Sequence, residues 1–271
     1  MSLKPVVTGM WIGDKLSTLE RLCIKSFTSH GYDFQLYVYN DVKNVPPETT
    51  VKDGSQILPR EKTDLVDKLD MRSIAYFSDL FRYKLLYEKG GWWVDMDTVC
   101  LKEVKLTGEP MVGSEGRPER KSLLDRLTGK RRFKGRTNAN IGFLKFPEKT
   151  EVMEYCFVKS EEILTSNKSI RWGDTGPVLL RSALKKFGKQ HYVVPWKTYC
   201  PVHLWNWKDF LDPEKTASLK QLENDPDVFC VHLWNELWRR GGVDKNQRFS
   251  ESTYISHLLS KFDVDPAPAG I

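Results

Sequence analysis

Two aspartates separated by one residue, Asp95 and Asp97, are the residues of this sequence best placed to do chemistry. On a regular strand, side chains two positions apart point to the same face, so both carboxylates can be presented together. Hard oxygen ligands of this kind suit Mn²⁺ or Mg²⁺, which keep substrate phosphate oxygens in their coordination shell. The pair therefore predicts a divalent-metal site at which a phosphate-bearing substrate binds.

The position of this pair in the chain favours that prediction. Gly90 and Gly91 end a preceding helical pattern, and the apolar stretch 92–94 predicts a short strand that leads into Asp95. Open α/β sheets bind ligands at the carboxyl ends of their strands. An isolated pair of acids is more often a solvated turn, and the placement at a strand end argues for the metal site instead.

A second polar pair precedes the acids by one helix. Asp79 and Arg82 lie three positions apart in the region 62–89, which is expected to be helical, with Phe81 packing on the sheet from the opposite side. Ser78 is expected to cap the last part of this region. The pair is either a surface ion pair, worth roughly a few tenths of a kcal/mol, or a rigid pair that holds sugar hydroxyls.

The elements that must position these residues form an α/β pattern. Apolar stretches at 5–10 and 34–39, with an amphipathic stretch at 17–29 between them, indicate a β-α-β unit that opens a parallel sheet. We expect one domain over residues 1–262 and a flexible tail over 263–271. Further strands are expected at 98–104, 139–146, 193–194 and 229–232, and a further helix at 176–187.

Composition narrows the classes of partner. The chain has 271 residues with 42 Lys and Arg against 36 Asp and Glu, and its net charge of +6 favours anionic partners such as nucleotide phosphates or anionic lipids. No basic stripe or nucleic-acid-binding motif accompanies this charge, so we expect no nucleic-acid partner. The five cysteines are scattered and lack CxxC spacing, which argues against a zinc site and a disulfide framework. Free thiols in a reducing compartment are the simplest interpretation.

The sequence also bears on localisation. No stretch approaches the ~18 apolar residues of a membrane span. The apolar run at residues 1–10 is too short for a signal peptide. We expect a cytoplasmic enzyme with peripheral membrane contact compatible with its charge, and a Golgi-luminal domain trimmed of its anchor is the alternative.

The stretch from Phe77 to Asp97, FSDLFRYKLLYEKGGWWVDMD, resembles the DXD-containing sugar-binding region of a group of glycosyltransferases. The group includes the yeast initiating α-1,6-mannosyltransferases, the α-1,4-galactosyltransferases, capsular polysaccharide glycosyltransferases and, more distantly, the large glucosylating toxins. Its pattern, S-D-x-x-R-Y-x-x-L-x-x-x-G-G-x-Y-x-D-x-D, is matched at nearly every fixed position, with Trp93 replacing the usual Tyr. Weaker similarities follow in the expected order at residues 6–11, 137–143, 174–177 and 231–238.

This resemblance implies a fold and a reaction. The fold is of the GT-A type, a single domain with a Rossmann-like, mixed but mostly parallel central sheet flanked by helices. The reaction is transfer of a sugar from a nucleotide-diphospho-sugar to a hydroxyl of a glycan or glycolipid acceptor, with retention of anomeric configuration. A UDP-sugar is favoured over a GDP-sugar as the donor, and Mn²⁺ (or Mg²⁺) is the implied cofactor.

The resemblance also implies roles for the matching residues. Asp97 would bind the metal directly, and Asp95 would bridge the metal, the ribose and the sugar. His232 would be either a further metal ligand or a structural residue. The donor would be held by Trp11 at the base, Asp79 and Arg82 at the sugar hydroxyls, Trp93 as an aromatic wall, and Trp234 near the diphosphate.

The far face of the sugar is expected to be lined by Asn140 and Asp174. A retaining reaction on this fold need not use a carboxylate nucleophile, and the sequence offers no convincing one. We hypothesise that Asp174, just before the Thr-Gly-Pro start of a helix, orients the acceptor hydroxyl. The basic segment 130–136 is expected to be a mobile surface loop, either simply solvated or bringing Arg136 over the diphosphate.

Two tryptophans in the C-terminal third, Trp205 and Trp207, lie two positions apart. Exposed rings of this kind stack on sugars, whereas buried rings belong to the core. We expect one ring to pack in the core and the other to contact the acceptor.

Three other functions are compatible with parts of the pattern. A sugar nucleotidyltransferase would carry a Gly-rich basic loop after the first strand, and residues 11–15 are too sparse for one. A metal phosphohydrolase would need more His and Asp ligands. A catalytically degenerate sugar-binding or scaffold protein would not need both DXD acids together with Asp79 and Arg82, and donor hydrolysis or transfer separates it from an enzyme.

Overall fold

A computed structural model describes residues 4–63, 71–103, 109–116, 137–166 and 169–266. The basic segment 130–136, including Arg136, lies outside the described residues, as do residues 267–271. The expected mobile loop and most of the expected flexible tail therefore stay predictions. Within the described ranges, no helix is both long enough and apolar enough to cross a membrane.

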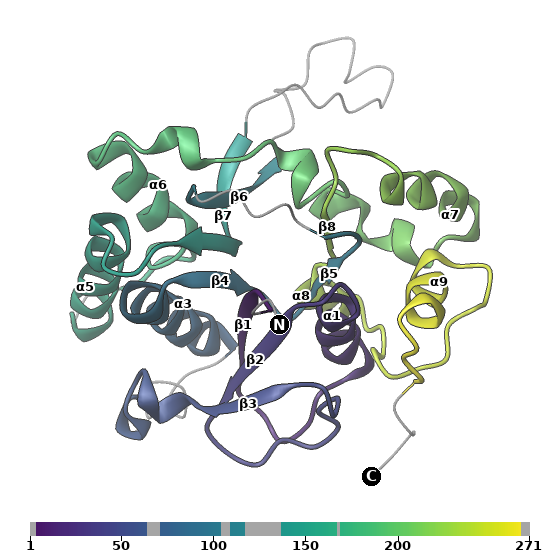
Figure 1. The fold of residues 1–271 in the computed structure, drawn as a ribbon, viewed down its shortest axis with the longest axis horizontal. Helices are drawn as coiled ribbons and strands as arrows, with labels where there is room; N and C mark the ends of the chain where they lie inside the picture. Colours follow the sequence, from purple (N-terminus) through teal and green to yellow (C-terminus); the bar gives the residue numbers. More distant parts are fainter. Residues whose placement is uncertain (1–3, 64–70, 104–108, 117–136, 167–168, 267–271) are drawn as a thin grey trace.

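A six-stranded sheet with the strand order β3-β2-β1-β4-β7-β6 forms the centre of the protein, with helices on both of its faces (Figure 1). The strands of this sheet are β1 (Val6–Trp11), β2 (Asp33–Val38), β3 (Thr50–Asp53), β4 (Gly91–Val94), β6 (Met111–Gly116) and β7 (Thr137–Phe146). The strands β1 to β4 pair in parallel, and β7 runs antiparallel to both β4 and β6. The predicted mixed, mostly parallel sheet flanked by helices is therefore confirmed.

The parallel pairing of β1 with β4 explains how distant segments meet. Thr8 on β1 is in register with Trp93 on β4, so Trp11 and Asp95, which follow in their strands, come to the same edge of the sheet. This is the edge at which open α/β sheets bind ligands. The expected β-α-β opening is also present, because α1 (Thr18–Ser29) connects β1 to β2 and begins after a capping box formed by Ser17 and Glu20.

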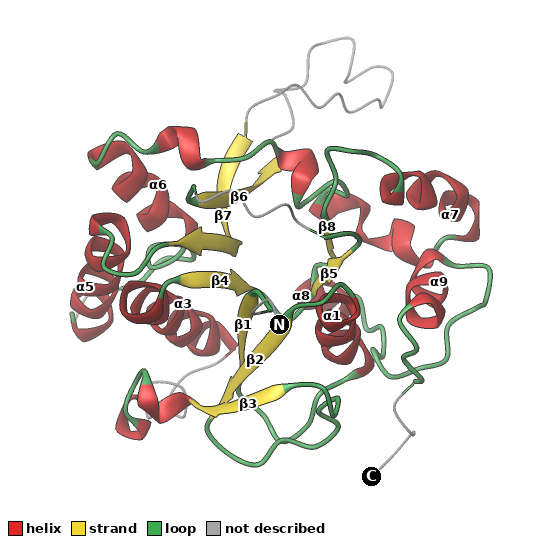
Figure 2. Ribbon diagram, viewed as in Figure 1, coloured by secondary structure: helices red, strands yellow, loops and turns green. Residues whose placement is uncertain are grey.

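Alternating side chains of the central strands fill two cores, one on each face of the sheet. Trp93 faces a core built with α3 (Met71–Lys89), α5 (Glu151–Thr165) and α6 (Pro177–Lys186). Trp92 and Val94 face the opposite core, which includes residues of α1. Figure 2 shows α3 and α5 on one side of the strands and α1 on the other. Because β4 is buried from both sides, its end is held rigidly.

A second, two-stranded sheet joins the central sheet to the C-terminal part. The strand β5 (Thr98–Cys100) starts directly after Asp97 and pairs antiparallel with β8 (Cys230–His232), with Thr98 opposite His232. A C-terminal core packs beside it. That core involves the 3-10 segment η5 (Leu204–Leu211), α7 (Pro213–Lys220), α8 (Asn235–Arg240) and α9 (Tyr254–Lys261). The packed part of the chain reaches Val264, which is buried against this core.

Two local expectations were wrong. Ser78 does not cap a helix, because α3 already begins at Met71, and its hydroxyl instead accepts a hydrogen bond from Arg82. Val193 and Val194 do not form a strand. Val193 makes only an isolated bridge to Val112, since the short 3-10 turns on either side leave no room for a longer ladder.

Candidate functional site

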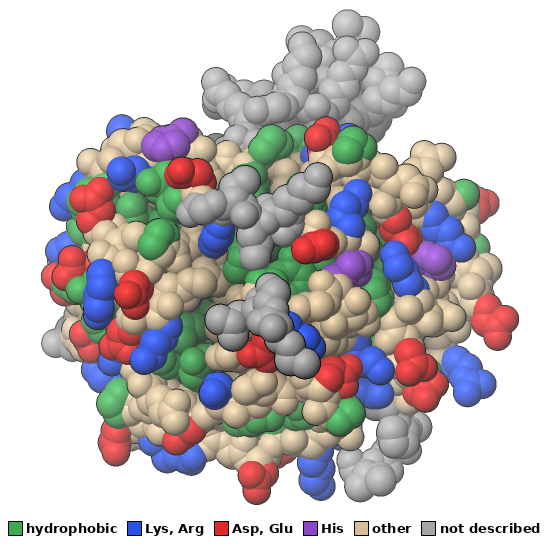
Figure 3. Space-filling view, viewed as in Figure 1, with side chains coloured by type: hydrophobic (Ala, Val, Ile, Leu, Met, Phe, Trp, Pro, Cys, Tyr) green, Lys and Arg blue, Asp and Glu red, His purple; other side chains and the backbone are tan. Residues whose placement is uncertain are grey.

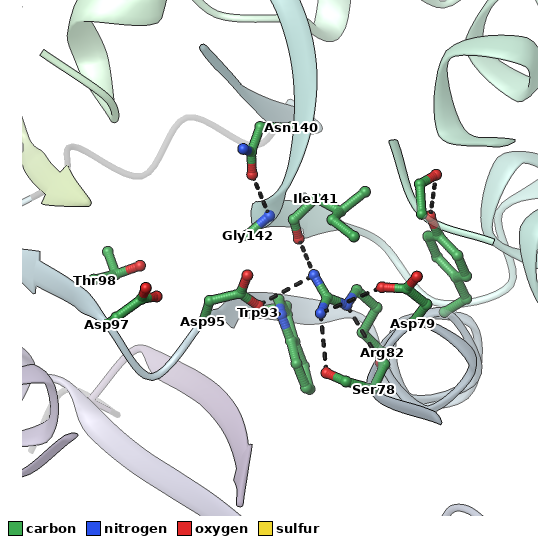
Figure 4. Close-up of polar contacts among 12 residues, drawn as sticks. Ser78, Asp79, Arg82, Trp93, Asp95, Asp97, Thr98, Asn140, Ile141 and Gly142 are labelled. Atoms are coloured by element: carbon green, nitrogen blue, oxygen red, sulfur yellow. Dashed lines mark hydrogen bonds and ion pairs between the residues drawn. The ribbon is translucent and has the colours of Figure 1, made fainter. Parts of the chain in front are cut away.

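The guanidinium of Arg82, in the middle of α3, is a buried cation at the centre of the site (Figure 4). Its Nη1 lies 3.1 Å from Asp95 Oδ1 and donates a 2.7 Å hydrogen bond to the carbonyl of Ile141. Its Nη2 lies 3.6 Å from Asp79 Oδ1 and donates to the Ser78 hydroxyl at 3.0 Å. Only a planar group with several fixed donors can serve all these partners. Arg82 therefore ties α3 to the end of β4 and to the middle of β7.

Asp79 is buried beside Arg82, with only 5% of its surface exposed, so the alternative of a surface ion pair does not apply. The hydroxyl of Thr175 donates a 2.8 Å hydrogen bond to Asp79 Oδ2. Burial raises the pKa of Asp79 to about 6, against the opposing effects of the Arg82 charge and the Thr175 hydrogen bond. A Cβ on Gly176 would lie 3.0 Å from the same Asp79 oxygen. The Thr-Gly-Pro start of α6 is thus shaped around this carboxyl group.

Trp93 supports the site from beneath instead of lining it. The indole N–H donates a 2.9 Å hydrogen bond to Asp95 Oδ1, and the guanidinium carbon of Arg82 lies 4.9 Å from the ring centroid. The ring is 1% exposed and packs in the core with α3. The expected aromatic wall facing the donor is therefore wrong for Trp93. The Trp93 indole N–H instead orients Asp95. Trp93 thus supplies a hydrogen-bond donor at the position where the family pattern has a tyrosine hydroxyl.

Gly142 allows the β7 backbone to approach Asp95 closely. A Cβ at this position would lie 2.7 Å from Asp95 Oδ2 and would also collide with the Tyr199 hydroxyl. The neighbouring Asn140 accepts a 2.6 Å hydrogen bond from the backbone N–H of Gly142 through Oδ1. Gly142 therefore lies between Asn140 and Asp95, and its N–H fixes the orientation of the Asn140 amide (Figure 4).

Asp97 is held by residues far away in the sequence. His232 Nε2 lies 3.0 Å from Asp97 Oδ1, and the backbone N–H of Asn235 donates to Oδ2 at 2.8 Å. The backbone N–H of Leu233 donates to the Asp97 carbonyl at 2.9 Å. The pairing of β5 with β8 creates this arrangement, because it sets Thr98 opposite His232. Both carboxylate oxygens of Asp97 are thus fixed individually.

Charge pairing determines the ionisation of Asp97 and His232. Burial alone would raise the pKa of Asp97, but the charge and hydrogen bond of His232 outweigh it and the pKa is lowered. Burial alone would lower the pKa of His232, and the charge of Asp97 outweighs it, so this pKa is raised. Each side chain therefore favours the charged form of the other.

Three side chains at this point fit a divalent cation. One possible ligand atom from each of Asp95, Asp97 and His232 lies within 4.8 Å of the others, and the described residues contain no other such group of three. His232 Nε2 is the ring nitrogen beside Asp97, and the buried Nδ1 has no hydrogen-bond partner in the described part of the chain. Two carboxylates and one imidazole are ligands that Mn²⁺ accepts. The predicted ligand set is thus brought together, with the ion itself still a proposal.

Trp234 adjoins His232 in a strained backbone conformation. Its ring centroid lies 4.1 Å from that of His232, and its indole N–H donates a 2.9 Å hydrogen bond to the carbonyl of Val202. Trp234 has φ 61° and ψ 50°, a left-handed conformation that costs about 1–2 kcal/mol for a residue with a Cβ. Strain of this kind is kept where surrounding contacts impose it, which is common at functional sites.

Trp11, the expected wall of the base pocket, stands at the end of β1 on the same edge of the sheet. Its indole N–H donates to the carbonyl of Lys15 at 3.1 Å, and Lys245 Nζ lies 5.7 Å from the ring centroid. Lys245 was missed from the sequence, because nothing local links it to a residue more than 200 positions earlier. Sequence reasoning also missed Glu20 and Asn235, although Glu20 could have been read from its capping box.

The contacts described for the remaining predicted residues, Asp174, Trp205 and Trp207, do not involve the two DXD acids. Asp174 accepts a 2.9 Å hydrogen bond from the backbone N–H of Arg171, within its own loop and one residue before Thr175. Trp207 is buried in the C-terminal core, whereas Trp205 is 48% exposed, which matches the expected division between core and surface. Basic and acidic side chains are interspersed over the face shown in Figure 3.

Two glycosyltransferase family models match this chain in sequence. The one described as "Glycosyltransferase sugar-binding region containing DXD motif" matches residues 17–116. The one described as "Alpha 1,4-glycosyltransferase conserved region" matches residues 161–261. The first match contains Asp95 and Asp97, and the second contains His232 and Asn235. The resemblance to DXD-containing glycosyltransferases, stated from the sequence, is thereby confirmed.

Curated relatives agree with these matches. The chain is 25% identical over 174 residues to "Lactosylceramide 4-alpha-galactosyltransferase" of Rattus norvegicus, covering 60% of this chain and 41% of that protein. The protein of the same name from Mus musculus is 26% identical, with 60% and 42% covered. The chain thus spans about two fifths of the length of these relatives.

Among solved structures, the PaToxG glycosyltransferase has a TM-score of 0.49 and 14% identity, covering 96% of this chain and 86% of that one. The apo form of the glycosyltransferase GlyE of Streptococcus pneumoniae has a TM-score of 0.38 and 14% identity, with 99% and 66% covered. The assignment of the fold here rests on the strand order and pairing of the chain itself.

Proposed function

We propose that this chain, which carries the DXD-containing region of a glycosyltransferase family, transfers a sugar from a nucleotide-diphospho-sugar to a hydroxyl group. The observation that carries the proposal is the convergence of Asp95, Asp97 and His232 at the end of β4, directly beside the buried Asp79–Arg82 pair. One group fits a divalent cation, and the other offers hydrogen bonds to a sugar. A nucleotide-diphospho-sugar needs both.

The donor would lie along the carboxyl edge of the central sheet. Its base would rest against Trp11, its diphosphate near Asp97 and His232, and its sugar between Asp79 and Asn140. A UDP-sugar is favoured over a GDP-sugar, since the curated relatives are named as galactosyltransferases. The expected contact of Arg136 with the diphosphate concerns a residue outside the described part of the chain and stays a prediction.

The chemistry follows from where charge develops. Breaking the anomeric C–O bond leaves negative charge on the nucleoside diphosphate, and a divalent cation, Mn²⁺ or Mg²⁺, would supply positive charge there when bound. Asp95 has one oxygen occupied by Trp93 and Arg82, which leaves the other to face the donor. Arg82 keeps Asp79 and Asp95 oriented, so the chain's own groups hold the sugar without rearrangement during the reaction.

We propose retention of anomeric configuration, with Asn140 on the far face of the sugar. The fixed amide of Asn140, bonded to the Gly142 backbone, supports this placement. Asp174 would orient the acceptor hydroxyl from the neighbouring loop. Transfer left intact by Asp174→Ala would overturn that role without touching the rest of the proposal.

The acceptor is proposed to be a glycan or glycolipid, because the curated relatives are named for a glycolipid, lactosylceramide. The half-exposed Trp205 offers a ring on which an acceptor sugar can stack. We place the enzyme in a reducing compartment, and the five cysteines, all free and buried, support this compartment. We also propose that the enzyme is peripheral to a membrane. A luminal domain of a longer protein is the alternative.

The test is an assay of donor turnover. The purified chain is incubated with a panel of UDP-sugars and GDP-sugars and Mn²⁺, with and without simple glycoside acceptors, and nucleotide release is measured. We expect one donor class to be consumed, with loss of turnover on adding EDTA and an α-linked product by NMR from an α-linked donor. No turnover of any donor by folded protein would favour the catalytically degenerate scaffold, and an inverted product would reject retention.

A further inference from the structure

A short series of hydrogen bonds leads from Asp97 away from the site to the start of α1. The backbone N–H of Asn235 donates to Asp97 Oδ2 at 2.8 Å, and the Asn235 side chain donates through Nδ2 to Glu20 Oε1, also at 2.8 Å. Glu20 Oε2 in turn accepts the backbone N–H of Ser17 at 2.7 Å. Asn235 thus holds Asp97 with its backbone while its own position is fixed by Glu20.

Glu20 is a fully buried carboxylate. It closes the capping box of α1 with Ser17, and it is 0% exposed. Its Oε1 accepts from both Asn235 and the Lys245 ammonium, the latter at 2.7 Å. A buried carboxylate is costly unless every lone pair is used. Here both oxygens are occupied, and the partners of one of them lead to the functional site.

The second branch from Glu20 reaches the expected base pocket. Lys245 Nζ lies 5.7 Å from the centroid of the Trp11 ring, and its side chain is 23% exposed. The next residue, Asn246, accepts the backbone N–H of Thr18 at 3.0 Å. One buried carboxyl group therefore contacts both the residue that holds Asp97 and the residue that faces Trp11.

The backbone before Asn235 is shaped to make this contact. Trp234 adopts the left-handed conformation, and this turn lets His232 reach one oxygen of Asp97 while Asn235 reaches the other. An Asn235 side chain that served only to fasten the C-terminal part to α1 would not need a strained residue in front of it. The geometry favours a positioning role directed at Asp97.

We propose that Asn235, anchored on the buried Glu20, is a positioning residue that sets the Asp97 carboxylate for a divalent cation, and that Glu20 links this carboxylate through Lys245 to the base pocket at Trp11. This inference rests on the proposed function, because it assumes that Asp97 binds the cation. Outer partners of metal ligands commonly change metal affinity by about 10- to 100-fold when removed.

The experiment compares Mn²⁺ binding by wild type, Asn235→Ala and Glu20→Gln, with Glu236→Gln as the matched control. Glu236 is adjacent to Asn235, and its carboxylate pairs with the exposed Arg239 and Arg240. Free Mn²⁺ is measured by electron paramagnetic resonance in the presence of UDP. UDP affinity without metal and the unfolding midpoint are recorded for each variant.

We expect Asn235→Ala to weaken Mn²⁺ binding by about 10- to 100-fold while UDP affinity without metal changes by less than about twofold. Glu20→Gln keeps the size of the side chain but cannot serve all three donors, so it should weaken Mn²⁺ binding by at least about threefold. It should also weaken metal-free UDP binding, because Lys245 loses its anchor. Glu236→Gln should match wild type in its affinity for Mn²⁺ and in its affinity for UDP without metal.

Three results would overturn the inference. A lowered unfolding midpoint with unchanged Mn²⁺ affinity in Asn235→Ala would mean that the residue is only structural. If Asn235→Ala does not fold, an unchanged Mn²⁺ affinity in Glu20→Gln decides against the proposal in the same way. Absence of Mn²⁺ binding by wild type would reject the proposed function as well, so the two failures are distinguishable.

Discussion

Asp95 and Asp97 are separated by one residue, yet they belong to two different parts of the molecule. Asp95 is held by Trp93 and Arg82, which precede it closely in the chain and sit on β4 and α3. Asp97 is held by His232 and Asn235, which lie 135 and 138 positions away. The first group falls within residues 17–116 and the second within 161–261, the two separate family matches.

The different surroundings of Asp95 and Asp97 suggest that one side of the site supports folding and the other binds the ligand. The Asp95 side is a polar cluster built around Arg82, whose guanidinium contacts both Asp79 and Asp95. On the Asp97 side, His232 Nδ1 has no hydrogen-bond partner among the described residues, and Trp234 has a strained backbone conformation of the kind found at functional sites. We therefore expect changes on the Asp95 side to affect folding strongly, and changes on the Asp97 side to affect function strongly.

The largest expected effect is functional and falls on the Asp97 side. Asp97→Asn keeps the size of the side chain but removes the charge that a cation and His232 require. We expect donor turnover to fall by on the order of a thousandfold, the scale seen when a preorganised charge-stabilising group is removed. The measurement is nucleotide release at saturating donor. Residual activity above a tenth of wild type would show that Asp97 is not essential.

On the Asp95 side, Arg82→Met should destabilise the folded protein. Removing the guanidinium leaves the buried Asp79 and the partly exposed Asp95 without their shared counter-charge, and breaking a buried ion pair typically costs about 3–5 kcal/mol. Urea unfolding followed by tryptophan fluorescence gives the free energy of unfolding. The control is Arg240→Met, an exposed partner of Glu236, with an expected change below about 1 kcal/mol. Equal stabilities for the two variants would contradict the comparison.

The ionisation of Asp79 makes the stability of the same cluster depend on pH. Its pKa is raised to about 6, above the value of about 3.9 in an unfolded chain. The folded protein therefore binds more protons between these two values, and the stability that Asp79 contributes is full below pH ~4 and lost as the pH rises through 6.

Asp79→Asn cannot titrate, so wild type should lose about 2–3 kcal/mol relative to this variant between pH 4 and pH 7. The measurement is the difference in free energy of unfolding at several pH values, in which carboxyl groups common to both proteins cancel. A difference that stays constant with pH would show that Asp79 has an ordinary pKa.

The smallest expected effect lies in the C-terminal region, at the exposed Trp205. If its ring stacks on the acceptor, Trp205→Ala should raise the acceptor KM by about threefold to tenfold, in line with the ~0.5–1.5 kcal/mol of an aromatic contact. The donor KM should not change. Steady-state kinetics with each substrate varied in turn measures both. An effect on the donor KM alone would move Trp205 to the donor side.

The comparison also shows what could be predicted from the sequence. The sheet and the Asp95 side were accessible, because Asp79, Arg82 and Asp95 lie within one contiguous segment whose periodicity and glycine break are local signals. The burial of Arg82 and Asp79 could not be predicted from the sequence, since it depends on the packing of β7 and α6 over these two residues. The face that Trp93 occupies was not predicted, because a single-residue step in a short strand moves a ring from one face to the other.

The Asp97 side was only partly accessible. His232 could be proposed from its resemblance, but its contact with Asp97 depends on the β5–β8 pairing, and β8 is three residues long. The bond between Asn235 and Glu20 spans 215 positions and leaves no local pattern. Lys245 is one of 42 basic residues, and only the fold distinguishes it from the others.

We propose that Asp97 and its distant partners form a cation-dependent donor site, and the ligand-induced stabilisation of the folded protein can be measured to test this. Thermal unfolding is measured for wild type and Asp97→Asn against UDP-sugars and GDP-sugars, with and without Mn²⁺. A donor at about a hundredfold its dissociation constant should stabilise wild type by roughly 2.7 kcal/mol. We predict that this stabilisation requires Mn²⁺ and is lost in Asp97→Asn. Equal stabilisation of both proteins, or stabilisation without Mn²⁺, would contradict the account.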